Sequence, residues 1–369
     1  MSPRYERRQR GGGGALLLLI AAAALVVAVL AIFTDVFSGK KAPDKDTDSP
    51  AVTQPADGEP DGTGDADNTA KDPEGDQKGG QSGNGDGNTD KSTVTTTKPA
   101  ASNVITTDAT PYQSGGVYIV GNAGYEMYNY VGSLAEKYQS TVNAVADSLS
   151  GVSNVYAMAI PLSSSITLPD SLLSDIPGSD QAQAEKDILA GMGQNIKTVP
   201  LHDALNAHRT EYIYFRTDHH WTSLGAYYAY CAWRGIEPNA DEWTQEILCD
   251  NFHGTTWNKV PLPTVPAEEI TAWYKHEYHN VSYNGGEYET NSIYECKYLS
   301  GSDQHAVFLN SNQAQTVISG SGKSGKLLLI KDSYGNTFSQ FPVEDYAEVH
   351  VLDLRFFKGD VTEYAKEND

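Results

Sequence analysis

The chain has 369 residues, of which 20% are charged, and its formal net charge at pH 7 is −22. Residues 1–14 contribute +3 and residues 34–110 contribute −8, which leaves −17 for residues 111–369. A domain this acidic is poorly suited to bind a polyanion. We therefore expect no nucleic-acid partner, and neutral or cationic partners, sugars included, stay open.

The N-terminus combines a basic tail with a long apolar run. Residues 15–33 are 19 consecutive apolar residues, which as a helix would be roughly 28 Å long, close to the thickness of a bilayer core. The tail of residues 1–14 holds four arginines and is expected to stay cytoplasmic. We therefore expect a transmembrane signal anchor in the cell membrane, with an extracellular C-terminal domain. A cleaved signal peptide is the alternative, but Thr34-Asp35-Val36-Phe37 follows the run instead of a small-x-small site.

Residues 34–110 have the composition of a disordered acidic linker. They are mostly Asp, Gly, Thr, Ser, Lys, Pro and Asn, with almost no aromatic or branched apolar side chains. Such a segment cannot bury enough apolar surface to offset the entropy of ordering it. Its Asp- and Asn-rich runs lack the bidentate Glu of a calcium loop, so we expect a plain tether and no cofactor.

Between residues 111 and 369, buried-strand patterns alternate with helical ones. The strands expected are 117–120 and 125–128, paired as a hairpin, then 155–160, 196–200, 212–216, 327–330 and 349–354. The helices expected are about 130–149, 180–193, 202–208 and 223–233, with a short one after Ser333. Repeated β–α alternation implies an α/β domain with a mostly parallel sheet flanked by helices.

Residues 236–310 break this alternation and are rich in tryptophan and tyrosine. Asn284-Gly285-Gly286 is a hairpin signal, so we expect a β-containing insertion. Its aromatic residues either stack on sugar rings or pack a small core of the insertion; they are Trp243, Trp257, Trp273, Tyr278 and Tyr283.

The three cysteines are Cys231, Cys249 and Cys296, and no CxxC spacing supports a zinc or redox motif. One disulfide with a free thiol and three unpaired thiols both stay open.

Two segments carry residues suited to chemistry. In the first, Arg216-Thr217-Asp218-His219-His220-Trp221-Thr222, an extended backbone would put Asp218 and His220 on one side and His219 on the other. A carboxylate beside an imidazole fixes its tautomer and leaves the other ring nitrogen free to take a proton. Metal binding is the alternative, with a third ligand from His202 or His253.

The second segment is Lys331-Asp332-Ser333-Tyr334-Gly335-Asn336, where an apolar strand enters a sharp turn and a short helix. A serine hydroxyl needs an adjacent base to act as a nucleophile, and backbone N–H groups of the following turn favour an oxyanion. The competing interpretation is that Ser333 only caps the helix.

Three strings resemble one known family. YFRTDHHWTSLGAYYAY (214–230), LLLIKDSYGNTF (327–338) and VLDLRFF (351–357) resemble the DHHW protein family of Gram-positive bacteria. More distantly they are similar to SGNH-like proteins of alginate and cell-wall polysaccharide O-acetylation. The resemblance implies an SGNH-hydrolase-like fold in which Ser333 is the nucleophile, His220 the base and Asp218 its orienting partner. It also implies substrate-binding or auxiliary roles, which we assign to Arg355, Asn336, Tyr334, His219 and Trp221.

The resemblance further implies acetyl transfer to, or hydrolysis from, a cell-surface polysaccharide, beside a membrane-bound O-acyltransferase. The alternative is a catalytically inactive SGNH-like module that binds glycan or scaffolds that acyltransferase. Two features depart from the relatives. The usual Gly and Asn oxyanion blocks are not evident, with Asn336 and Asn310 as substitutes, and the relatives continue beyond the strand of VLDLRFF with another strand and helix.

Overall fold

The computed structural model describes residues 15–22, 110–260, 265–322 and 324–368. The cytoplasmic tail and almost the whole expected linker lie outside these residues, as do residues 23–33 of the apolar run. The described helices are α2 (Gly132–Ser148), α3 (Ser163–Ile166), α4 (Gln181–Ala190), α5 (His202–Asn206), α6 (Ser223–Arg234), α7 (Thr255–Lys259), α8 (Tyr334–Phe338) and α9 (Val361–Glu367). Short 3₁₀ helices are η1 (Asp170–Leu172), η2 (Ala240–Glu242), η3 (Cys296–Ser300), η4 (Gln304–Val307) and η5 (Pro342–Glu344).

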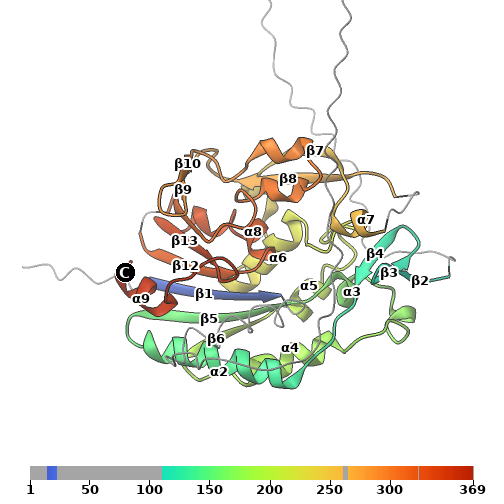
Figure 1. The fold of residues 1–369 in the computed structure, drawn as a ribbon, viewed down its shortest axis with the longest axis horizontal. Helices are drawn as coiled ribbons and strands as arrows, with labels where there is room; N and C mark the ends of the chain where they lie inside the picture. The colour runs from blue at the N-terminus through green and yellow to red at the C-terminus, as the bar shows by residue number, and fades with distance from the viewer. Residues whose placement is uncertain (1–14, 23–109, 261–264, 323, 369) are drawn as a thin grey trace, which may run out of the picture. The chain divides into compact units, whose positions relative to one another are not determined.

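An eight-stranded sheet forms the centre of the fold, with the strand order β10-β9-β11-β13-β12-β1-β5-β6 (Figure 1). Its strands are β1 (Ala15–Ala22), β5 (Ser153–Ile160), β6 (Ile196–Pro200), β9 (Asn280–Tyr283), β10 (Tyr288–Thr290), β11 (Gln315–Ser319), β12 (Lys326–Lys331) and β13 (Glu348–Asp353). Strands β13, β12, β1, β5 and β6 are parallel, whereas β11, β9 and β10 pair antiparallel. The expected α/β class is therefore confirmed, and five of the eight strands are parallel, but β11, β9 and β10 make the sheet mixed.

Two smaller antiparallel sheets complete the described strands. One contains β2 (Tyr112–Ser114), β3 (Val117–Val120) and β4 (Ala123–Glu126), and the other pairs β7 (Thr244–Phe252) with β8 (Glu268–Tyr274). The expected β content of residues 236–310 is confirmed. This stretch is nevertheless not a separate unit, because its β9–β10 hairpin extends the central sheet at one edge.

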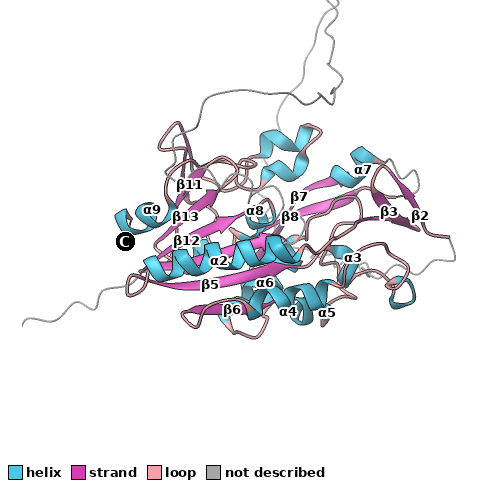
Figure 2. Cartoon of the chain, turned by 60° about the horizontal axis from the view of Figure 1, so that its bottom comes forward, coloured by secondary structure: helices cyan, strands magenta, loops and turns pink. Residues whose placement is uncertain are grey.

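Apolar side chains of β12 alternate between two cores, one on each face of the central sheet. Leu327 and Leu329 pack into a core shared with α6 and α8, whereas Leu328 and Ile330 pack into a core shared with α2 and α9. Figure 2 shows α2 running across its face of the sheet. A strand with helices on both faces must be apolar on both, which explains the unbroken Leu-Leu-Leu-Ile run.

The expected helices at 130–149 and 223–233 and the strands at 155–160, 196–200, 327–330 and 349–354 are confirmed to within a few residues. The strand expected at 212–216 is wrong, because this segment forms only one isolated bridge, between Tyr214 and Trp221. All three cysteines are free.

In the structure, residues 15–22 form strand β1 between β5 and β12. A short apolar run is compatible with either a buried strand or a membrane helix, so hydropathy by itself does not distinguish them. No helix among the described residues is long and apolar enough to cross a membrane.

The aromatic residues of the insertion are divided between the core and the surface. Trp243, Trp273 and Tyr283 are buried in the same core as α6, so these three do pack, but into the main core and not into a small core of the insertion. Tyr278 is 64% exposed, and the half-buried Trp257 stacks on His253. Of the five aromatic residues considered, only Trp257 and Tyr278 stay accessible to a sugar ring.

The buried carboxylate of Glu268, at the start of β8, holds the loop that precedes α6. It accepts hydrogen bonds from the N–H groups of Arg216 (2.7 Å) and Thr217 (2.8 Å), and from the hydroxyls of Thr217 and Tyr212. These four hydrogen bonds to one carboxylate join the insertion to this loop.

Replacing Glu268 with Gln should lower the free energy of unfolding by about 1–3 kcal/mol, because the amide places a donor where buried donors need an acceptor. Chemical denaturation measures this loss. Glu287→Gln, at an exposed position of the insertion, is the matched control and should stay within about 0.5 kcal/mol of wild type. Equal stability of the two variants would contradict the role of Glu268.

Candidate active site

The segment with Asp218, His219 and His220 is a tight loop between α5 and α6. The Oδ1 atom of Asp218 accepts the N–H of His220 at 2.9 Å, which bends the backbone into an Asx turn. Because the segment is not extended, the expected separation of His219 from its neighbours is wrong. The Nδ1 atom of His219 lies 3.8 Å from Asp218 Oδ1, and its ring centroid lies 3.9 Å from that of His220.

Ser333 lies just beyond the carboxyl end of β12, where ligands commonly bind in α/β sheets. It occupies the N-cap position of α8, but its hydroxyl makes no capping hydrogen bond. The interpretation of Ser333 as only a helix cap therefore lacks the contact that it requires. Its side chain is half-buried, so the hydroxyl is not sealed inside the core.

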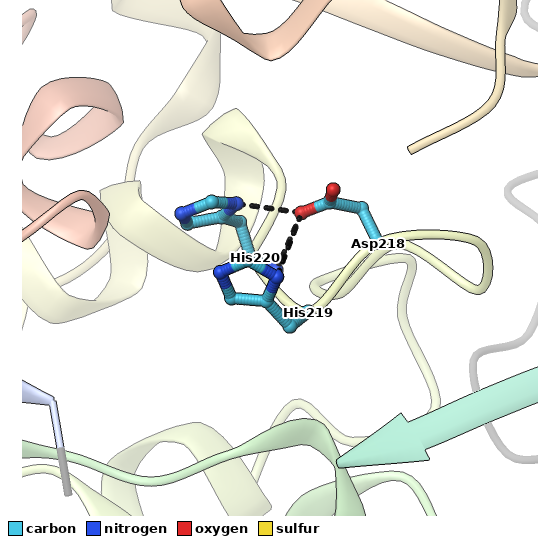
Figure 3. A group of neighbouring side chains, drawn as sticks. All are labelled: Asp218, His219 and His220. Carbon is cyan, nitrogen blue, oxygen red and sulfur yellow. Dashed lines mark hydrogen bonds and ion pairs between the residues drawn. The ribbon is translucent and has the colours of Figure 1, made fainter. Parts of the chain in front are cut away.

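The structure brings Asp218, His220 and Ser333 together in one chain of contacts. Ser333 Oγ lies 2.8 Å from His220 Nε2, and His220 Nδ1 lies 2.6 Å from Asp218 Oδ1. Figure 3 shows the Asp218 carboxylate directed at the Nδ1 atoms of both histidines. Since Nδ1 of the neutral ring donates its hydrogen to Asp218, Nε2 is left as the acceptor for the Ser333 hydroxyl.

Asp218 is fully buried, and its second oxygen is also occupied. Oδ2 accepts the N–H of Thr255 at 2.7 Å and its hydroxyl at 2.9 Å. Burial alone would raise the pKa of Asp218, but the adjacent imidazoles and the hydrogen bond from His220 hold this pKa well below 3.8. A methyl group on Gly254 would overlap the Asp218 side chain, so only glycine permits this approach. The carboxylate is thus ionised and fixed in place.

Burial lowers the pKa of His220 from 6.5 to about 4, with a further lowering from His219. Asp218 acts in the opposite direction but does not offset the loss of solvent. The ring is therefore neutral at pH 7 and able to accept a proton. This is the protonation state that a base for the Ser333 hydroxyl requires.

Direct hydrogen bonds connect the two motifs beyond the Ser333–His220 contact. Trp221 Nε1 donates to the carbonyl of Tyr334 at 3.1 Å, and the Tyr334 hydroxyl donates to the carbonyl of His219 at 2.5 Å. Trp221 and Tyr334 are both buried. We infer that these two residues hold the loops together and do not contact a substrate.

Arg355 belongs to a charged cluster beside the site. It donates to Asp353 from Nε (2.8 Å) and Nη2 (2.5 Å), and Asp353 also accepts from the buried Lys331 at 3.1 Å. The positive charge of Arg355 contributes to lowering the pKa of His220, less than burial and His219 do. The hydrogen bonds from Arg355 and the charge of Lys331 keep the pKa of Asp353 lowered despite burial.

Both residues expected as oxyanion donors make other hydrogen bonds, but only in Asn336 does the contact use the donor nitrogen. Asn336 Nδ2 donates to Asn312 Oδ1 at 3.2 Å, and Asn310 Oδ1 accepts from the Tyr298 hydroxyl at 3.0 Å. In the turn itself, the N–H of Tyr334 donates to Asp332 Oδ1 and that of Gly335 to the Asp332 carbonyl. The amide oxygen of Asn336 is buried and has no hydrogen-bond partner among the described residues.

Asp218, His219 and His220 have ligand atoms close enough together to hold a metal ion. Each of these side chains already has a protein partner, because Thr255 Oγ1 lies 2.7 Å from His219 Nδ1 and Ser333 Oγ lies 2.8 Å from His220 Nε2. The two histidines proposed as a third ligand make other contacts: His202 lies 2.8 Å from Ser165 Oγ, and His253 stacks on Trp257. The donor set therefore suits a proton relay better than a metal centre.

Sequence reasoning missed four residues that shape the site: Thr255, Glu268, His305 and Asn312. Thr255 and Glu268 fix Asp218 and its loop, His305 stacks on His220, and Asn312 contacts Lys331 and Asn336. They come from the insertion or the segment after it, far along the chain from either motif. No local signal distinguishes them in the sequence.

Together, the fold and these contacts define an α/β protein with a serine–histidine–aspartate arrangement at the carboxyl end of its parallel strands. The family model described as DHHW protein matches residues 88–352. Because this match spans more than half of the chain, the chain belongs to the DHHW family. No curated protein matches the chain.

Solved structures share this fold. A DHHW family protein from Eubacterium siraeum DSM 15702 is similar, with a TM-score of 0.61 and 24% identity over 70% of this chain and 89% of that one. PatB1 of Bacillus cereus with a sulfonyl adduct has a TM-score of 0.55 and 18% identity, covering 68% of this chain and 90% of that one. A second structure of B. cereus PatB1 has a TM-score of 0.54 and 17% identity, covering 70% of this chain and 92% of that one. The expected membership of the DHHW family is thus confirmed.

Labelling of Ser333 by a fluorophosphonate should require neutral His220. Because the pKa of His220 is lowered to about 4, the labelling rate should stay near its maximum at pH 6 and fall only as the pH approaches that value. An exposed histidine would lose half of the rate near pH 6.5. Mass spectrometry of the labelled peptide measures the rate, and far-UV circular dichroism at each pH checks that the protein stays folded. A midpoint at pH 6.5 or above would contradict the buried, neutral ring.

Proposed function

We propose that this chain is a serine-dependent acyl-transfer enzyme that moves acetyl groups to, or hydrolyses them from, hydroxyls of a cell-surface polysaccharide. One observation carries the proposal: Ser333 Oγ lies 2.8 Å from His220 Nε2, whose Nδ1 lies 2.6 Å from the ionised Asp218. A hydroxyl, a neutral imidazole and a buried carboxylate in this order form the arrangement used for acyl transfer at serine.

The chemistry follows from these contacts. As Ser333 Oγ attacks the carbonyl carbon of an acetyl donor, His220 Nε2 takes the hydroxyl proton, and Asp218 stabilises the imidazolium. His220 then returns the proton to the leaving group, which leaves acetyl-Ser333. An acceptor hydroxyl or water attacks this ester by the reverse sequence, giving transfer or hydrolysis. The positive charge of Arg355 near the site favours the negative oxygen of each intermediate.

The charge of the domain and the resemblance of its motifs support the proposed substrate class. The domain carries a net charge of −17, which disfavours polyanions and suits a neutral polysaccharide. The chain resembles SGNH-like proteins of polysaccharide O-acetylation in the motifs that hold Ser333 and His220. The sulfonyl adduct in the PatB1 structure is in keeping with a fold that presents a nucleophile.

The same proposal puts the catalytic domain outside the cell membrane, anchored by residues 15–33 and working beside a membrane-bound O-acyltransferase. The anchor and strand β1 are alternative uses of residues 15–22, because one backbone segment cannot be a membrane-spanning helix and a strand of the central sheet at the same time. The 19-residue apolar run with arginines on its N-terminal side supports the anchor.

An inactive glycan-binding or scaffolding module is the second candidate. The observation that favours it is the engagement of the turn's N–H groups, since Tyr334 and Gly335 both donate to Asp332. A module of this kind would bind glycan equally well with or without the Ser333 hydroxyl. Replacing Trp257 and Tyr278 would then remove binding.

Ser333→Ala should lower acetyl release from p-nitrophenyl acetate at least about 10³-fold and abolish fluorophosphonate labelling, because no other group replaces the nucleophile. Ser165→Ala is the matched control, since Ser165 Oγ also lies 2.8 Å from a histidine, His202, but lies outside the site. It should retain wild-type activity. Full activity of Ser333→Ala would reject the proposal. Mass analysis of a neutral oligosaccharide acceptor then separates transfer from hydrolysis.

The anchor is tested on the full chain expressed in Gram-positive cells. We expect it to remain in the membrane pellet after alkaline carbonate extraction, and the C-terminal domain to be cleaved by protease added to intact cells. Replacing three leucines among residues 16–19 with Asp should release the chain from the pellet, because charged residues oppose insertion. Extraction of the unmodified chain by carbonate would argue against the anchor and leave β1 as the role of these residues.

A further inference from the structure

Three imidazole rings are stacked at the site, and the ring of His220 is the middle one. The His305 ring lies with its centroid 3.9 Å from that of His220 and is inclined by only 8°. The His219 ring also contacts the His220 ring, with 3.9 Å between centroids and an inclination of 35°; Figure 3 draws these two rings. Among the described residues no ring contact joins His219 to His305, which is consistent with their lying on opposite faces of His220.

Asp218 by itself does not fix the orientation of His220. It holds one ring edge through Nδ1, but the torsion that turns an imidazole about its Cβ–Cγ bond has a broad energy minimum. Rotation about that bond swings Nε2 away from Ser333 Oγ. Flat rings in contact with both faces oppose this rotation, because the His220 ring cannot turn without overlapping one of them.

His305 is itself held firmly. It lies in η4, is buried, and has its Nε2 atom 3.2 Å from the hydroxyl of Thr337. Phe215 contacts it edge-on at 6.2 Å and Phe308 at 5.3 Å between ring centroids. Thr337 belongs to α8, the helix that begins directly after Ser333. The same helix therefore supports both His305 and the serine.

We propose that His305 is a positioning residue: with His219 it holds the His220 ring between two flat surfaces and keeps Nε2 directed at the Ser333 hydroxyl. This inference rests on the proposed roles of Ser333 and His220. It assigns no contact between His305 and the substrate.

The charges around the stack are compatible with this role. Asp218, His219 and Arg355 act on His220, whereas His220, Asp218, His219 and Asp303 act on His305. Burial, reinforced by His220, keeps the pKa of His305 well below 6.5, so this ring is neutral. When His220 takes the serine proton, a neutral neighbour adds no repulsion, whereas two imidazolium rings at 3.9 Å would repel each other.

Two variants separate a positioning role from simple packing. His305→Ala should lower kcat for p-nitrophenyl acetate by about 10- to 100-fold with little change in KM, because the base loses its alignment and substrate binding does not. Water entering beside His220 should also raise its pKa, so the acid limb of the pH profile of kcat/KM should move upward towards pH 6.5. His305→Phe restores a flat ring and should recover kcat to within about threefold, with the acid limb back near its wild-type position. His208→Ala removes a histidine stacked on Tyr228 outside the site and should match wild type.

Wild-type kcat and an unmoved acid limb in His305→Ala would overturn the inference. So would a His305→Phe variant that loses as much kcat as His305→Ala while both remain folded. NMR titration measures the pKa of His220 directly in the inactive Ser333→Ala protein. Adding His305→Ala to that protein should raise the pKa of His220. If this rise occurs but wild-type protein is inactive, the proposed function fails and the positioning role stands. If wild-type protein is active and the rise is absent, the positioning role fails.

Discussion

The hydrogen bond between His220 Nε2 and Ser333 Oγ joins two segments that are 113 positions apart in the chain. Neither segment is part of a long helix or strand at that point, so each must be fixed by contacts from outside. The structure supplies them as buried polar interactions: Glu268 holds the backbone before Asp218, Thr255 holds its carboxylate, and Tyr334 contacts the carbonyl of His219. Because such contacts are strong only when water is excluded, the geometry of the site depends on the packing around it.

The same exclusion of water sets the charges at the site. Desolvation lowers the pKa of His220 and keeps it neutral, whereas Asp218 remains ionised because four donor groups and the adjacent imidazoles stabilise its negative charge. A neutral base next to a fixed anion can accept a proton without first releasing one. Asp353 binds Lys331 and Arg355 together, which confines two cations at the carboxyl end of β12.

Local pattern predicted much of the fold and the residues of the relay. The apolar run of β12, the 17-residue α2 and the strands β5 and β6 have periodicities that sequence alone reveals. The segment before Asp218 resembled a strand in composition, but its backbone donors bind the side chain of Glu268 and form no ladder. Thr255, Glu268 and His305 carry no local signal, because their roles depend on contacts across the chain. Composition favoured packing for Trp243 and Trp273 but could not exclude a surface role, since it does not tell which face of an insertion is covered.

The origin of Glu268, Thr255 and His305 in residues 236–310 limits how this scaffold can be re-engineered. Exchange of the whole segment between homologues, a common route to altered specificity, would remove the supports of the relay along with any substrate contacts. Chimeras of this type would be inactive for reasons unrelated to recognition. Exposed positions such as Glu287 have no such role, so sequence diversity introduced for library selection belongs there and not in β8 or η4. Gly285 and Gly286 beside it adopt positive φ and are best kept as glycine.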